Sequence, residues 1–308
     1  MKELYLPTGN EYVSLPDISE RTATVGSFSC LHMGAKGLVE FRGADEPLIA
    51  PFASGAELTD FAWRRLGHWV PEFTARAGEL ILHGTILAPV GERGFIFRLS
   101  LENPTDEAAE AEYGLRGVWG GARVCINESR GIRGEMGVTD SLWSSGPVFE
   151  LSCALPFLAF APMCDREISS AHGEGQGGTA YCLTRRAALG PGESDSACFF
   201  WGLGYEEVAA ATSAKEMLRR GWDYELKKTL AYLAAREWRS GDEQLDKTYN
   251  LNLFFCIFFS TGVTLDTEEF VLVTSRSPRY YVSAAYWDRD SLLWASPAVL
   301  DADAALAR

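Results

Sequence analysis

The residues best suited to chemistry form one short run late in the sequence, Tyr286-Trp287-Asp288-Arg289-Asp290-Ser291. An aromatic ring can cover the apolar face of a pyranose. A planar guanidinium can donate to two adjacent hydroxyls, and a neighbouring carboxylate can accept from two more. The run is therefore predicted to bind a sugar through Trp287, Arg289, Asp290, Asp288 and Tyr286. The plainer alternative is a helix start that carries an exposed ion pair.

The spacing of the two aspartates argues against a complete catalytic pair. The run lies at a predicted helix start, where carboxylates interact favourably with the helix dipole. Side chains two residues apart in a helix diverge by roughly 200°. Glycoside hydrolysis needs two carboxyls that flank one bond, about 5–5.5 Å apart for retention and 6.5–9.5 Å for inversion. We therefore expect no catalytic pair in this chain, with at most one member supplied by Asp288 or Asp290.

The elements that precede this run are predicted to be strands as far as about residue 205. Short β-rich stretches alternate with turns, a pattern typical of a large antiparallel sandwich. The predicted strands cover residues 22–31, 80–87, 94–101, 111–119, 148–155, 180–184 and 197–201. The Gly-rich patch at 172–178 is predicted to be a flexible loop. It lacks the flanking strand and helix of a phosphate-binding turn, so no dinucleotide cofactor is expected.

A helical linker is predicted to follow, over residues 206–237. This stretch is rich in Ala, Leu, Lys, Arg and Glu, has no proline, and is expected to break at Gly221. Thr212 or Ser213 is the predicted N-cap, with Glu216 completing a capping box after Ser213.

Two further helices are predicted beyond the linker. Residues 242–259 are apolar nearly all round, which is typical of a helix buried between layers. Residues 291–295 form a short helix that Pro297 is expected to end.

The stretch from Gly241 to Leu293 resembles the opening of a six-hairpin, (α/α)6-barrel glycosidase domain. The resemblance rests on a buried helix with Asp246-Lys247-Thr248-Tyr249-Asn250, a loop, and then the 286–291 run. Glucoamylases and bacterial glycogen-debranching-type enzymes carry a Trp-x-Arg-Asp or Gly-Arg-Asp motif there. By this resemblance Trp287, Arg289 and Asp290 would hold the sugar in the −1 subsite, while Asp288 occupies a variable position.

The resemblance extends loosely to the strands. The turn Glu102-Asn103-Pro104-Thr105-Asp106 and Leu115-Arg116-Gly117 in the next strand are similar to the β-supersandwich that precedes such barrels. It implies a supersandwich domain at 1–205, a helical linker at 206–240 and the start of a truncated (α/α)6 catalytic domain at 241–308. The chain would then be the N-terminal portion of an inverting glycoside hydrolase for α-glucosides or related oligosaccharides, inactive as this fragment.

Two alternatives remain open. One is a sugar phosphorylase of the same architecture, which uses inorganic phosphate in place of water. The other is a non-catalytic carbohydrate-binding or interaction sandwich. Its stacking surface would be Trp63, His68 and Trp69, with Trp143 as a similar candidate, unless these side chains are core.

The loop before the run carries four more candidates for the same cleft. Arg276, Arg279, Tyr280 and Tyr281 precede the run by only a few residues, so they are expected to lie close to it. The alternative is an exposed basic loop.

Composition excludes several other classes. A net charge of −14 opposes binding to phosphate backbones and anionic lipid surfaces, so neither nucleic acid nor membrane is an expected partner. Seven cysteines without Cys-x-x-Cys spacing and four scattered histidines predict no metal site. The N-terminus has no apolar signal region, so a cytoplasmic protein is expected, and the sequon Asn127-Glu128-Ser129 is then without consequence. Exposed apolar helix faces are expected to favour a homo-oligomer.

Overall fold

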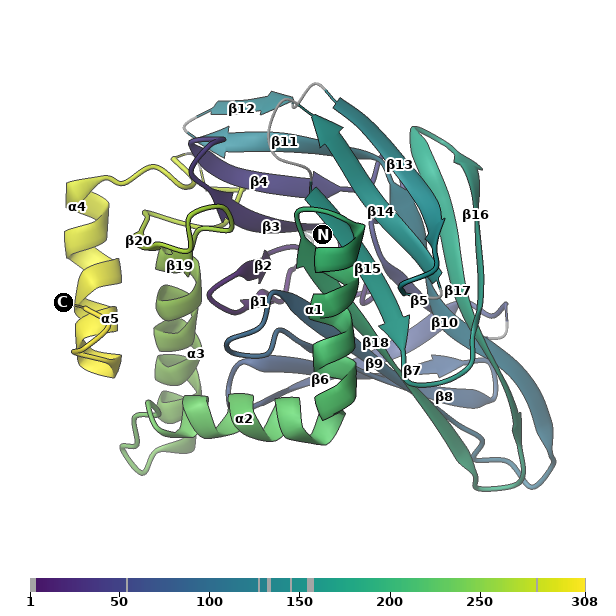
Figure 1. Ribbon diagram of the computed structural model, residues 1–308. Helices are drawn as coiled ribbons and strands as arrows, with labels where there is room; N and C mark the ends of the chain where they lie inside the picture. Colours follow the sequence, from purple (N-terminus) through teal and green to yellow (C-terminus); the bar gives the residue numbers. More distant parts are fainter. Residues whose placement is uncertain are drawn as a thin grey trace.

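The fold is a β-sandwich followed by a helical region, as the sequence predicts (Figure 1). The computed structural model describes residues 4–307 except 54, 127, 132–133, 145, 154–157 and 281. Within these residues no helical barrel is closed. The last strand of the sandwich, β18, ends at Gly204 and the first helix, α1, begins at Glu207. The division into three domains stays a prediction.

One layer of the sandwich is an eight-stranded sheet in which all neighbouring strands are antiparallel. In sheet order its strands are β13 (Gly134–Ser141), β14 (Gly146–Cys153), β15 (Leu158–Cys164), β18 (Ser194–Gly204), β9 (Gly94–Glu102), β8 (Leu80–Leu87), β7 (Val70–Ala77) and β6 (Leu58–Leu66).

Two smaller sheets complete the sandwich. The first has the order β1 (Thr8–Gly9), β2 (Val13–Leu15), β3 (Ser27–His32), β4 (Gly37–Arg42), β11 (Gly121–Ile126) and β12 (Glu128–Gly131). The second has the order β16 (Ser169–Gly175), β17 (Gly178–Leu189), β10 (Ala109–Trp119) and β5 (Ala50–Ala53).

Aromatic side chains from all three sheets meet in the main core. Phe28 of the six-stranded sheet contacts Phe160 of the eight-stranded sheet edge to face, with ring centroids 4.3 Å apart. Phe149 of the large sheet contacts Tyr181 of the four-stranded sheet at 4.7 Å. Such pairs add to the free energy that burial of apolar area already supplies.

The large sheet also has a buried outer face. Along β9 the side chains of Phe95 and Phe97 enter the main core, whereas Ile96 points the other way and joins a second cluster. That second cluster includes Met217 and Leu233 from the helices that cover this face. A strand buried on both sides explains why residues 94–101 are so apolar.

The covering helices are α1 (Glu207–Arg220) and α2 (Trp222–Ala234), which meet at Gly221 as predicted. Gly221 has φ 83°, a left-handed conformation that glycine adopts without steric cost. The predicted capping box is wrong, because α1 begins six residues before Ser213. The Ser213 hydroxyl instead donates to the carbonyl of Ala209, one turn earlier, at 3.0 Å.

Helix α1 packs directly on β18, which allows a sharp test of the fold. A Cβ atom added to Gly202 would lie 2.2 Å from the carbonyl oxygen of Ala210 and 2.3 Å from the amide nitrogen of Ala214. We expect Gly202→Ala to lower the free energy of unfolding by about 1–3 kcal/mol, the usual cost of overpacking. The measurement is urea unfolding, with Gly173→Ala on exposed β16 as the control, since a Cβ there meets nothing within 4 Å. Equal midpoints for the two variants would contradict this packing.

The helix predicted at 242–259 is confirmed as α3 (Glu243–Ser260), with Asp242 as its N-cap, but burial is confined mainly to its C-terminal half, since most residues of its first two turns are exposed. The Asp242 carboxylate accepts from the backbone amides of Gln244 and Leu245, both at 3.0 Å. The hairpin of β19 (Thr261–Val263) and β20 (Phe270–Leu272) follows. It returns to the sandwich, where the amide of Val263 donates to the carbonyl of Glu11 at 2.8 Å.

The C-terminal helical segment is longer than predicted. It runs through α4 (Asp288–Asp290), the π-helical turn η1 (Ser291–Ala295) and α5 (Ser296–Ala302). Pro297 therefore does not end the helix. The amide of Ser296 bonds the carbonyl of Ser291, and this wider i→i+5 turn comes just before the proline, which lacks an amide proton of its own.

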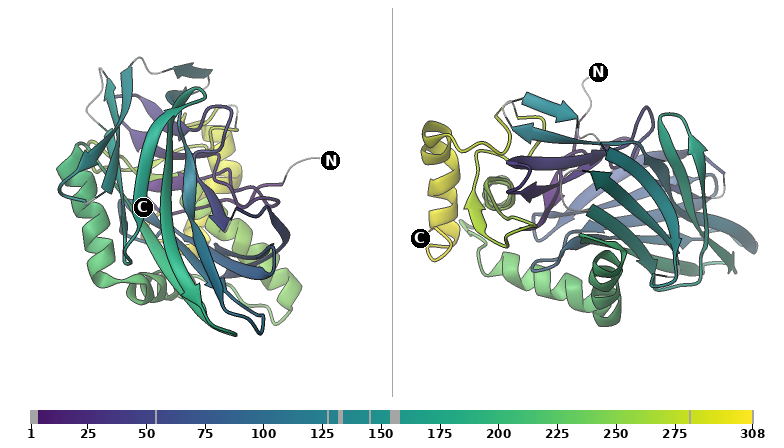
Figure 2. Two further views of the ribbon diagram at one scale, coloured as in Figure 1. Left: turned by 90° about the vertical axis from the view of Figure 1, so that its right-hand side faces the viewer. Right: turned by 45° about the horizontal axis from the view of Figure 1, so that its top comes forward.

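Figures 1 and 2 place this C-terminal helical segment at the periphery, on the side of α3 away from the sandwich. The hydroxyl of Tyr249 on α3 donates to the Asp301 carboxylate at 2.6 Å and so links α3 to α5. Leu292, Leu293 and Leu300 remain 63 %, 73 % and 57 % exposed. Self-association through this face stays a prediction.

The flexible loop predicted at 172–178 is wrong. Residues 169–175 form β16, which pairs with β17 in an unbroken register from Ser169 opposite Thr184 to Gly175 opposite Gly178. The Gly-rich composition suits the tight turn at 176–177, where Gly177 has φ 80°. The remaining glycines and small polar residues simply occupy an exposed edge strand.

Candidate functional site

The run Tyr286 to Ser291 forms the junction between a loop and the C-terminal helical segment. Trp287 is extended, with φ −123° and ψ 111°, and the helix begins at Asp288. The amide of Trp287 donates to the hydroxyl of Thr274 at 3.0 Å, and the amide of Ser291 donates to the carbonyl of Trp287 at 2.9 Å. These bonds fix the backbone on both sides of Trp287.

The two aspartates occupy different environments, as their helical spacing predicts. Asp288 is exposed, whereas the Asp290 side chain is only 15 % exposed. Asp290 accepts from the hydroxyl of Tyr280 at 3.4 Å and from Nη2 of Arg289 at 3.4 Å. Asp290 thus contacts two neighbouring side chains, whereas the side chain of Asp288 is exposed to solvent.

The remaining members of the run present their polar and aromatic surfaces to solvent. The Arg289 side chain is 68 % exposed, while Tyr286 and Trp287 are 50 % and 39 % exposed. Behind the run, the ring of Tyr280 packs against Trp294 at 5.8 Å. Tyr286, Trp287 and Arg289 thus form one surface that is exposed to solvent, which we call the 286–291 wall.

Arg276 does not line this wall, so that prediction is wrong. Its side chain is fully buried, and burial lowers its pKa to about 10, which still leaves it charged at neutral pH. Its Nη1 donates to the carbonyls of Phe258 at 3.0 Å and Thr261 at 3.3 Å, and also to the carbonyl of Asn10. Arg276 therefore joins the end of α3 to the N-terminal segment.

The other residues of this loop that were predicted to line the wall differ in their contacts. Arg279 pairs with Asp17 and lies over the ring of Tyr5, 3.7 Å from its centroid, so it attaches the loop to the sandwich. Tyr280 is the loop residue that contacts the run. Tyr281 lies outside the described residues.

The structure divides the predicted stacking surface on the sandwich, because Trp63 and His68 line one pocket and Trp69 does not. Trp69 is buried, donates its indole N–H to the carbonyl of Gly9 at 2.9 Å and stacks on Phe258, so it is core. Trp63 is partly buried and donates to the carbonyl of Glu20 at 2.7 Å. Trp143 is 64 % exposed in the turn between β13 and β14.

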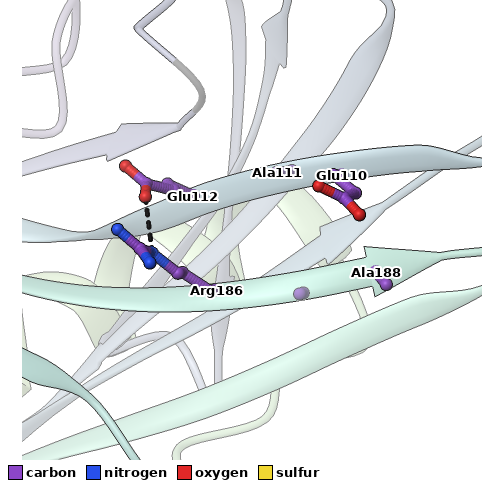
Figure 3. A pocket seen from close by; sticks show the side chains of 6 residues that line it. Glu110, Ala111, Glu112, Arg186 and Ala188 are labelled. Atoms are coloured by element: carbon purple, nitrogen blue, oxygen red, sulfur yellow. Dashed lines mark hydrogen bonds and ion pairs between the residues drawn. The ribbon is translucent and has the colours of Figure 1, made fainter.

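A hollow of about 590 Å³ lies on the four-stranded sheet, over β10 and β17 (Figure 3). Glu110, Glu112, Arg186 and Ala188 line it, and Glu112 pairs with Arg186 at 2.7 Å. No aromatic ring lines this hollow, so it lacks the flat apolar surface that a sugar ring needs.

The described part of the chain contains neither a clustered set of metal ligands nor a helix that could span a membrane. Those residues contain no cluster of three or more His, Cys, Asp or Glu placed to hold a metal ion. None of their helices is both long and apolar enough to cross a bilayer.

Sequence reasoning missed the residues that support the run. Thr274, which holds the Trp287 amide, lies thirteen positions earlier, and no local pattern signals that contact. The contact depends on the loop folding back, since the amide of Thr274 donates to the carbonyl of Ala285 at 2.9 Å.

The fold of this sandwich with its helical region is shared with a solved protein structure. Among solved structures, the chain is similar to a putative kojibiose phosphorylase from the human microbiome, with a TM-score of 0.50 and 10 % identity over 82 % of this chain. The predicted resemblance is therefore confirmed at the level of fold. No family profile and no curated protein matches the sequence.

The chain also aligns with two other solved structures, at lower TM-scores. A bacterial glucoamylase complexed with acarbose gives a TM-score of 0.44 and 7 % identity over 85 % of this chain. A family GH92 α-mannosidase from Bacteroides thetaiotaomicron gives 0.43 and 10 % over 87 %. The chain spans 38 %, 44 % and 41 % of the lengths of the phosphorylase, glucoamylase and mannosidase chains, less than half of each.

Proposed function

We propose that this chain supplies the sandwich domain and one wall of the sugar-binding subsite of an enzyme that acts on α-glucosides or related oligosaccharides. The observation that carries the proposal is the arrangement of the 286–291 run. Tyr286, Trp287 and Arg289 are presented to solvent on a backbone fixed by Thr274, with Asp290 held behind them. The similarity of the fold to that of a putative kojibiose phosphorylase supports the same assignment.

Each residue of the wall has a distinct chemical task in this proposal. The Trp287 ring covers the apolar face of the pyranose in the −1 subsite, and Tyr286 extends that surface. Arg289 donates to adjacent hydroxyls, and its contact with Asp290 limits the rotamers that the guanidinium samples. The exposed carboxylate of Asp288 accepts from a further hydroxyl.

The reaction we propose is inverting hydrolysis of the glycosidic bond. A phosphorylase of the same architecture is the second candidate, favoured by the fold similarity to a putative kojibiose phosphorylase. The two reactions differ in the nucleophile, which is water or inorganic phosphate. In a protein that carries both catalytic groups, product analysis with and without phosphate distinguishes them, because only phosphorolysis releases a sugar phosphate.

We expect the 308-residue chain to bind gluco-oligosaccharide without turning it over. The helical spacing of Asp288 and Asp290 is unsuited to two carboxyls that flank one bond, and the contacts of Asp290 with Tyr280 and Arg289 support this expectation. The test is incubation with maltotriose, isomaltotriose and kojibiose, with and without phosphate, and chromatography of the products. The expected result is no release above a heat-treated sample. Robust turnover that Asp288→Asn abolishes would overturn this expectation.

The non-catalytic sandwich remains a distinct candidate, because Trp63 lines a pocket at the border with α3. Variants separate the two readings. If Trp63→Ala abolishes oligosaccharide binding and Arg289→Ala leaves it unchanged, the binding module is correct. The opposite result supports the 286–291 wall.

A further inference from the structure

A second pocket lies where the sandwich meets α3, between the edge strand β6, the turn that follows it, and the N-terminal half of the helix. Its volume is about 460 Å³, within the range of about 300–1,000 Å³ usual for small-molecule sites. Four side chains give it apolar surface: Leu6, Trp63, Pro71 and Leu251. The pocket is thus built by residues from three separate parts of the sequence.

Two cations that line this pocket, Lys247 and Arg65, have no carboxylate partner among the residues that the structure describes. Lys247 is exposed and forms no ion pair within the described residues. Arg65 is partly buried, and its Nη1 donates only to the carbonyls of Pro7 at 3.1 Å and Trp69 at 2.6 Å. Burial lowers the pKa of Arg65 to about 10, so it remains a cation at neutral pH. A partly desolvated guanidinium bonded only to neutral oxygens favours an incoming anion.

The other charged groups of the pocket are used differently. Arg64 pairs with Glu72, and Nε2 of His68 lies 3.3 Å from the Glu237 carboxylate, so each of these side chains already has an acidic partner. Glu243 is the one carboxylate among the lining residues of the pocket. It is suited to accept hydrogen bonds from hydroxyl groups rather than to bind the anion itself.

We propose that this pocket binds a small organic anion that also has an apolar face and hydroxyl groups, the chemistry of a phosphorylated monosaccharide. The phosphate would lie between Arg65 and Lys247, a sugar face would pack on Trp63 and Leu251, and Glu243 would accept from a hydroxyl. The site is separate from the 286–291 wall.

The geometry of α3 separates the two sites. Lys247 and Leu251 lie four residues apart and so share the helix face that lines the pocket. Tyr249 instead bonds Asp301 on α5, which belongs to the C-terminal helical segment. The pocket proposal therefore does not depend on the proposed function, and either can fail alone.

The test is isothermal titration of the 308-residue chain with glucose 6-phosphate, with glucose and inorganic phosphate titrated separately. We expect glucose 6-phosphate to bind at least about tenfold more tightly than either fragment. Lys247→Glu should weaken that binding by tenfold or more. The matched control is Lys215→Glu, which makes the same charge change on an exposed lysine of α1, away from the pocket, and should leave binding unchanged.

Four results would overturn the proposal. These are no saturable binding of glucose 6-phosphate at millimolar concentration, glucose binding equally well, phosphate binding equally well, or equal losses in Lys247→Glu and Lys215→Glu. If glucose binds equally well, Arg65 and Lys247 do not contribute to binding. If phosphate binds equally well, the apolar side chains of the pocket do not contribute. Circular dichroism of each variant establishes that it is folded.

Discussion

Arg276→Ala is expected to lower the free energy of unfolding by about 2–5 kcal/mol, the usual range when a large buried side chain is truncated to alanine and leaves a cavity. Arg276 is fully buried and donates to carbonyls of Asn10, Phe258 and Thr261. Alanine would leave those carbonyl oxygens without this donor and would open a cavity between α3 and the N-terminal segment. An unsatisfied buried acceptor typically costs about 1–3 kcal/mol by itself.

The measurement is urea unfolding followed by circular dichroism and by tryptophan fluorescence. Arg279→Ala is the matched control. Its side chain is 48 % exposed and its ion pair with Asp17 reaches solvent, so it should cost no more than about 1 kcal/mol. Arg276→Met, which retains most of the volume, separates the cavity from the lost hydrogen bonds. If Arg276→Ala and Arg279→Ala lower stability equally, the structural role assigned to Arg276 is wrong.

Arg289→Ala and Trp287→Ala are each expected to weaken binding of α-linked gluco-oligosaccharides by about 10- to 100-fold, which corresponds to about 1.4–2.7 kcal/mol. Arg289→Ala removes a forked donor, and Trp287→Ala removes the flat surface against the pyranose. Neither side chain is part of a described core cluster, so both variants should fold. The measurement is calorimetric titration with maltotriose and kojibiose.

The chain offers a closely matched control for each variant. Arg219 is 67 % exposed and pairs with Glu216, much as Arg289 is 68 % exposed and pairs with Asp290. Trp238 is 39 % exposed, as is Trp287. Arg219→Ala and Trp238→Ala should leave the affinity unchanged. Equal losses in the controls would show that general surface changes, rather than the wall, determine the affinity.

Much of the fold follows from local patterns. The apolar run from Gly94 to Leu101 predicts a strand, and β9 forms there because both of its faces are covered. The change from β-rich to helix-rich sequence near Tyr205 predicts the order of sandwich and helices. The break at Gly221 is likewise local, since glycine there adopts a left-handed conformation.

The errors come from contacts that sequence distance conceals. Arg276 belongs to a polar, proline-containing stretch that suggests an exposed loop, yet its partners include the carbonyl of Asn10. The stretch 172–178 has the composition of a loop, and only its pairing with β17 makes it a strand. Pro297 suggests a helix end, and the π-turn before it allows the helix to continue.

The residue types of the candidate site come from the sequence and stay a prediction, whereas most of the contacts that support the run appear only in the structure. The composition of the 286–291 run indicates sugar binding, and the helical spacing correctly separates Asp288 from Asp290. Thr274, which holds the Trp287 amide, carries no local signal, whereas Tyr280 is one of the loop residues that the sequence predicts to lie close to the run. Arg65 and Lys247 are still harder to foresee, because only the packing of α3 against the edge of the sandwich brings them to one pocket.

The central claim is that sugar contacts the 286–291 wall, and indole N–H signals in 15N-labelled protein test it most directly. The chain has nine tryptophans, and Trp287→Phe identifies the signal of Trp287. Titration with maltotriose or kojibiose should shift the Trp287 indole signal in a saturable way, with Trp63 and Trp143 unchanged. Saturable shifts of Trp63 or Trp143 with a constant Trp287 signal would contradict the claim.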